Sequence, residues 1–231
     1  EISECLVGSE MCIRDRLLIA EADSGNVLAV HDLGKLYSTN KNEEKSSEYY
    51  REALNGFTEI EPNADFIFPY ESDYQKPVDM RSYIWYRIGK MHCYGLGTQQ
   101  DYEKAFEWFL KSAKEGNKFA QYSLGNLYYY GNGTDKDLSQ AFHWYMKSAE
   151  QGQPYASYSI AQMYNKGEYV TKNEDTAQKY YKSALSGFLQ LESKNQMMIT
   201  CFIKWELCTK TVWVLILIWI RRLIISCVRR S

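Results

Sequence analysis

Apolar residues recur along the middle of this chain with the period of a helix. Residues 29–37, 84–91, 120–128 and 156–164 each carry apolar side chains three or four positions apart. This spacing places those side chains on one face of a helix. The sequence therefore predicts an amphipathic helix at each of these four places.

Two ladders of small residues show that these helices belong to a repeat. In both ladders, successive members lie 36 residues apart. The first ladder runs through the stretches YRIGKMH, YSLGNLY and YSIAQMY, and its members are Gly89, Gly125 and Ala161. The second ladder consists of Ala105, Ala141 and Ala177. A regular period of this length is typical of helical repeat proteins, and the near absence of a side chain in the first ladder predicts a close contact between helices.

A second helix follows in each unit. Asp101, Asp137 and Asn173 stand where a helix would begin and have side chains suited to capping it, and Gly116 and Gly152 stand where a helix would end. The apolar stripe between such signals is too wide for a lone helical hairpin to bury. We therefore predict an all-α fold, an α-solenoid in which antiparallel helix pairs stack on one another.

The predicted solenoid occupies residues 17–196. An earlier unit with the stretches HDLGKLY and SSEYYREALNGF brings the number of units to four. Their expected bounds are about 26–61, 79–117, 118–153 and 154–190, with a long insert at 62–78.

At this level of detail the sequence resembles a known family. The stretch LGNLYYYGNGTDKDLSQAFHWYMKSAEQGQPYA resembles a Sel1-like repeat, a relative of the tetratricopeptide repeat. The resemblance implies a right-handed superhelix whose concave surface binds proteins or peptides. More narrowly, LLIAEADSGNVLAVHDLGKLYST and KPVDMRSYIWYRIGKMHC are similar to repeat-bearing C-terminal extensions of bacterial plasmid mobilisation relaxases of the MobA/MobL type. The motifs of a relaxase nicking domain, a catalytic tyrosine and a histidine metal cluster, have no match in this sequence.

The first sixteen residues do not fit the repeat. The stretch LVGSEMCIRDR back-translates to a nucleotide sequence that resembles a transposase-type sequencing adapter. We expect residues 1–16 to be an artefact; the alternative is a short natural segment.

The pattern also stops at the other end. If the codons of residues 197–231 are read one base out of frame, they can encode another repeat. In that frame the codons of Met197, Met198 and Ile199 encode two consecutive aspartates, and the codons of later tryptophans encode residues typical of the repeat. We expect a frameshifted fifth repeat. The alternative is a membrane-associated element, although the apolar run 212–220 is shorter than the roughly 20 residues that a spanning helix needs.

Composition and charge exclude several classes of function. A formal net charge of -2 argues against a phosphate-binding track, so we expect no direct binding of nucleic acid by this fragment. Outside the two irregular ends only Cys93 remains, which fits a reducing, cytoplasmic location. His92 and Cys93 are adjacent and therefore diverge on a helix, and no further ligand stands at a useful spacing. The sequence predicts no catalytic residue, no cofactor and no metal site, hence no enzyme within this fragment.

The remaining candidates are aromatic. Tyrosines and tryptophans dominate binding hot spots, but they also fill cores, and both interpretations stay open here. The predicted partner-binding residues are Tyr70 and Tyr74 in the insert, and Trp85, Trp108 and Trp144 in the repeats. We interpret the protein as a scaffold for a protein or peptide partner, with a relaxase module as the narrower possibility. The alternative is an adaptor in secretion or membrane protein turnover.

Overall fold

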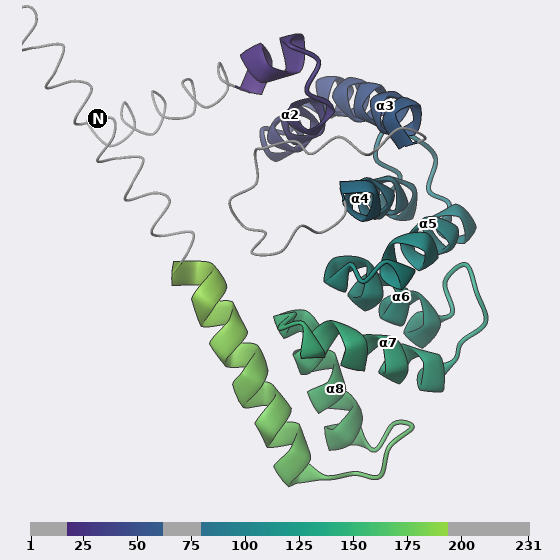
Figure 1. The fold of residues 1–231 in the computed structure, drawn as a ribbon, viewed down its shortest axis with the longest axis vertical. Coiled ribbons are helices and arrows are strands. Elements are labelled where there is room, and N and C mark those ends of the chain that lie inside the picture. Colours follow the sequence, from purple (N-terminus) through teal and green to yellow (C-terminus); the bar gives the residue numbers. More distant parts are fainter. Residues whose placement is uncertain (1–17, 62–79, 194–231) are drawn as a thin grey trace, which may run out of the picture.

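The computed structural model describes residues 18–61 and 80–193, and within these ranges the chain forms helices joined by short turns, with no strand (Figure 1). The prediction of an all-α solenoid is confirmed. The helices are α2 (Val27–Thr39), α3 (Glu43–Ile60), α4 (Met80–Tyr94), α5 (Tyr102–Lys114), α6 (Lys118–Tyr130), α7 (Leu138–Glu150) and α8 (Pro154–Lys166), with further helical residues at 18–23 and 174–193.

Consecutive helices form antiparallel pairs, α2 with α3, α4 with α5 and α6 with α7, and the pairs stack into a curved array (Figure 1). The fourth pair joins α8 to the helix of residues 174–193, shown in light green in Figure 1 and hereafter called the terminal helix. The suspected adapter at 1–16, the insert at 62–78 and the suspected fifth repeat at 197–231 lie outside the described residues.

Local capping explains where the second helices begin and end. Asp101 accepts a hydrogen bond from the backbone N–H of Lys104 at 3.0 Å, and Asp137 does the same for Gln140 at 2.9 Å. These bonds satisfy N–H groups that have no partner inside the helix. Gly116 lies just beyond the end of α5 with φ of 91°, a backbone conformation that disfavours other residues. The predicted start and stop signals are confirmed at these positions.

The small residues of the first ladder are contact points, as predicted. A Cβ atom added to Gly125 would lie 2.6 Å from the Tyr145 ring, and one added to Gly89 would lie 2.7 Å from the Phe109 ring. Such distances are shorter than van der Waals contact. The two helices of a pair therefore approach closely because the first one carries glycine at the crossing point.

The core of the described residues consists of three clusters, each of which joins helices of neighbouring pairs, and this confirms that the units bury their apolar stripes by stacking. Ala105 and Phe109 of α5 form one cluster with Leu124 and Leu127 of α6, and all four are almost fully buried. The next cluster joins Tyr145 of α7 to α8 in the same way. This stacking holds the first helices side by side and so arranges the surface described next.

Candidate partner-binding groove

Aromatic rings follow one line across the first helices of the repeats. Tyr86 of α4, Tyr122 of α6 and Tyr158 of α8 lie 36 residues apart, each three positions before a member of the first ladder. Two further rings, one helical turn before Tyr122 and Tyr158, connect these tyrosines. The ring centroid of Phe119 lies 5.8 Å from that of Tyr86, and the ring centroid of Tyr155 lies 5.9 Å from that of Tyr122. The repeat thus presents a row of aromatic faces along one side of the stack.

The terminal helix adds a wall to this surface. Its Phe188 packs edge-on against Tyr155 at 4.9 Å between centroids. Gly187 lies over Pro154, where an added Cβ atom would come within 2.8 Å of the proline Cβ. The missing side chain at Gly187 lets the terminal helix lie against the start of α8.

A groove of about 520 Å³ opens between α4, α6, α8 and the terminal helix. Its aromatic lining is accessible, since Tyr94 is 64% exposed and Tyr155 is 50% exposed. The terminal helix contributes Gln190 and the half-exposed Leu191. Exposed aromatic and apolar side chains in a concave surface are typical of a binding site.

Polar groups lie between the rings. Lys90 of α4 and Asn126 of α6 occupy equivalent positions, directly after the glycines of the first ladder, and both line the groove. The side-chain oxygen of Asn126 accepts a hydrogen bond from the Tyr145 hydroxyl at 2.7 Å, which leaves its NH2 group to donate elsewhere. Burial raises the pKa of Tyr86 to about 12, so its hydroxyl stays protonated and can also donate.

A cluster of charged side chains lies beside Lys90, at the junction of the first two pairs. The His31 ring nitrogen Nδ1 lies 3.1 Å from a carboxylate oxygen of Asp32 and 3.0 Å from Nη1 of Arg87. Burial holds the pKa of His31 below its usual value, and Asp32 only partly opposes this shift. Burial alone would raise the pKa of Asp32, but the hydrogen bond from His31 and the charge of Arg87 lower it overall. His31 is therefore neutral at pH 7 and Asp32 is charged.

The structure describes three of the five aromatic residues predicted from the sequence as partner-binding, namely the tryptophans. Tyr70 and Tyr74 fall outside the described residues, and none of the three tryptophans lines the groove. Trp85 donates a hydrogen bond to Glu61 at 2.9 Å. Trp108 and Trp144 lie on the second helices and pack partly and fully into the core, respectively, each with a lysine ammonium over its ring. The tyrosine row was the signal that could have located the groove, because its members repeat with the same 36-residue period.

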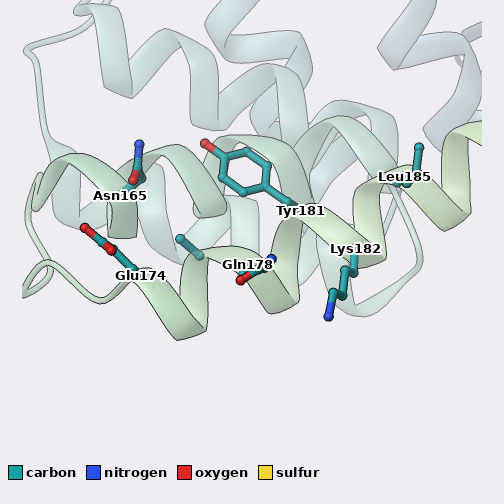
Figure 2. Close-up of a pocket in the computed structure, with 7 residues that line it drawn as sticks. Asn165, Glu174, Gln178, Tyr181, Lys182 and Leu185 are labelled. Carbon is teal, nitrogen blue, oxygen red and sulfur yellow. The ribbon is translucent and has the colours of Figure 1, made fainter.

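The outer face of the terminal helix differs from its counterparts. In α5 the residues facing the next pair are Tyr102, Phe106 and Leu110. Their equivalents on the terminal helix are Glu174, Gln178 and Lys182, which line a shallow hollow of about 380 Å³ beside α8 (Figure 2). These three side chains are polar or charged where those of α5 are apolar, although Tyr181 and Leu185 line the same hollow.

Two further observations concern metal binding and the single described cysteine. Within 18–61 and 80–193, no three His, Cys, Asp or Glu side chains gather as a metal site would require. Burial raises the pKa of the Cys93 thiol, which works against a nucleophilic role. None of the helices in these ranges is both long and apolar enough to cross a membrane.

Comparison with known families decides what these repeats are. The Sel1 repeat family matches residues 86–117, 118–153 and 154–187. Residues 86–187 are therefore similar to Sel1 repeats. Each match begins in or at the first helix of a pair and ends in or just after the second, so one Sel1 repeat corresponds to one helix pair of the solenoid. Sel1 repeat domains are non-catalytic modules, and proteins built from them generally act as protein–protein interaction scaffolds.

Solved structures carry the same fold. A Sel1 repeat protein from Oxalobacter formigenes is similar with a TM-score of 0.53 at 23% identity, over 70% of this chain and 58% of its own. The protein c5321 of uropathogenic Escherichia coli, a protective antigen with a Sel1-like repeat fold, has a TM-score of 0.53 at 27% identity, over 74% of this chain and 33% of its own. The chain thus spans about three fifths and one third of these two proteins. No curated protein matches the sequence.

Proposed function

We propose that the groove binds an extended segment of a partner protein and that the Sel1 repeats form the scaffold that presents it. The observation that carries the proposal is the set of aromatic rings that line the groove between α4, α6, α8 and the terminal helix, of which Tyr94 and Tyr155 are exposed. Aromatic side chains lose little conformational entropy on binding and offer large contact areas, which makes them frequent binding hot spots.

Filling the groove tests this proposal. Ser123 is half-buried and lines the groove, whereas Ser47 on α3 is exposed and lies outside it. Short peptides are selected from a random library on the wild-type protein, and their affinities are compared for Ser123→Trp and Ser47→Trp. We expect Ser123→Trp to weaken binding by about tenfold or more, which corresponds to about 1.4 kcal/mol, and Ser47→Trp to change it little. Equal binding by both variants would show that the partner uses another surface.

The five aromatic residues predicted from the sequence are proposed as a secondary contact surface. Trp108 and Trp144 support this idea least, because both contribute to the core. Tyr70 and Tyr74 belong to the insert. Replacing both tyrosines by serine is expected to reduce partner binding; a loss of thermal stability with unchanged binding would assign them to packing instead.

The narrower proposal is that this scaffold is the C-terminal module of a cytoplasmic plasmid mobilisation relaxase. Two stretches of sequence similar to such modules support it, and no comparison addresses it. Long-read sequencing of the source DNA, without transposase-derived adapters, is the test. A relaxase domain encoded upstream in the same frame is the expected result, and a further repeat beyond residue 196 would support the frameshift. A signal peptide upstream and a membrane anchor downstream would favour the adaptor alternative.

A further inference from the structure

The groove carries positive charge without a matching negative charge. Two of its lining residues are cationic, Lys90 of α4 and Lys118 of α6, and its lining contains no carboxylate among the described residues. Neither ammonium group forms an ion pair with a described side chain, although Lys118 lies 5.5 Å from the ring centre of Phe119. The two cations therefore face the open groove.

The surroundings of Lys90 strengthen this imbalance. Burial, together with the nearby positive charges of Arg87 and Lys35, lowers the pKa of Lys90. Among the described residues, the carboxylate that acts on Lys90 is Asp32, which is already in contact with His31 and Arg87. An anion placed in the groove would therefore reduce repulsion among these cations.

We propose that the partner segment is acidic, with carboxylates that pair with Lys90 and Lys118 and apolar side chains that lie on the rings between them. This inference rests on the proposed function and specifies the chemistry of the partner. Lys90 and Lys118 come from neighbouring repeats, and Tyr86 and Phe119 lie between α4 and α6 at 5.8 Å. An extended peptide alternates its side chains, so it can present both kinds of group to one surface.

A protein segment suits this groove better than a nucleic acid. The amide group of Asn126 and the side chains of Ser123 and Gln190 line it and can form hydrogen bonds with a peptide backbone. A nucleic acid neutralises many phosphates along a basic track, whereas this groove offers two lysines in a chain of net charge -2.

The test compares defined probes on the whole chain. The first is a short labelled peptide in which Glu alternates with Phe and Pro; the second has Gln in place of every Glu; the third is a thymidine oligonucleotide of similar length. We expect the Glu peptide to bind about tenfold or more tighter than the Gln peptide. This difference should disappear in the double variant Lys90→Gln, Lys118→Gln, and should shrink when salt rises from about 0.05 M to about 0.5 M.

Control variants distinguish the effect of the lysine charges on binding from a loss of the folded structure. Lys90→Arg with Lys118→Arg keeps the charges and should keep most of the preference for the Glu peptide. Lys114→Gln removes a charge from an exposed position of α5 outside the groove and should leave the preference unchanged. Circular dichroism and thermal melting confirm that the variants are folded.

Three results would overturn the proposal. If the Glu and Gln peptides bind equally and Ser123→Trp blocks both, the groove binds protein but does not select acidic segments, and the proposed function stands. If the oligonucleotide binds more tightly than the Glu peptide through the same two lysines, the partner is a nucleic acid. If Ser123→Trp leaves the binding of every probe unchanged, the groove is not the site and the proposed function fails with it.

Discussion

At the scale of the residue, the buried histidine at the junction of the first two pairs has the clearest physical consequence. His31 is 2% exposed, and its charged neighbours among the described residues are the cations Arg87 and Lys90 and the carboxylate of Asp32. A proton added to the ring would place a further positive charge among these cations. The neutral ring is therefore part of the folded state.

This environment predicts how stability depends on pH. Because the pKa of His31 is lowered in the folded protein, the unfolded chain binds the proton more readily, and the stabilisation is complete above the ordinary histidine pKa of about 6.5. We expect stability to fall as pH drops from about 6.5 through the lowered value. Urea unfolding at a series of pH values measures this, and His31→Gln should flatten the profile in that window.

A matched histidine provides the control. His143 is exposed on α7, so His143→Gln should leave the pH profile of the wild-type protein unchanged. Asp32 loses its charge at lower pH, because the pKa of its carboxyl is itself lowered, and its contribution falls outside this window. A wild-type profile that is already flat between pH 7 and pH 5 would contradict the prediction.

At the scale of the element, each second helix begins at a capping side chain. Asp137 accepts a hydrogen bond from the backbone N–H of Gln140 at 2.9 Å, and Asp101 and Asn173 do the same in their repeats. Asp135 lies two residues earlier, is exposed, and is not the cap of α7. Asp137 and Asp135 thus have the same side chain, but only Asp137 forms the capping hydrogen bond.

Removal of the cap should destabilise α7 specifically. We expect Asp137→Ala to cost about 1 kcal/mol of unfolding free energy, because one N–H group at the start of the helix loses its partner. Asp135→Ala should cost much less. Urea unfolding compares the two variants, and equal losses would mean that charge in the loop, rather than the capping bond, stabilises the helix.

At the scale of the whole molecule, stability comes from stacking between neighbouring pairs. Leu124 on α6 is fully buried in the cluster that α5 and α6 share, while Leu185 on the terminal helix lines the hollow of Figure 2 and is 59% exposed. The same residue type therefore occurs in an inner interface and on an outer face. Among α2 to α8, the larger contacts between pairs join neighbouring pairs, so a weakened inner interface affects the pairs on both sides.

This contrast predicts how replacing each leucine by alanine changes stability. Leu124→Ala should cost about 2 to 5 kcal/mol, because it leaves a cavity in the shared core, and Leu185→Ala should cost well under about 1 kcal/mol. Urea unfolding gives the free energies, and hydrogen exchange should show faster exchange in both α5 and α6 for Leu124→Ala. Loss of protection confined to α6 alone would argue that the pairs do not stabilise one another.

The sequence by itself determined the fold and most of the positions where its helices begin and end. Helical spacing, the period of 36 residues, the capping residues and the glycine contacts are encoded over short distances, and each recurs from unit to unit. A signal repeated several times is much stronger than one seen once. For that reason the solenoid and its helix pairs were predictable without any three-dimensional information.

Only the tertiary structure decided where the candidate groove lies. The groove combines side chains from α4, α6, α8 and the terminal helix, and Lys90 and Gln190 lie 100 positions apart in the sequence. From the sequence, Trp108 and Trp144 could either bind a partner or pack in the core; in the structure Trp108 packs partly and Trp144 fully into the core, while Tyr86 and Tyr122 line the groove. Which face of a helix is covered depends on how neighbouring pairs pack, and that arrangement cannot be read from the period of a single helix.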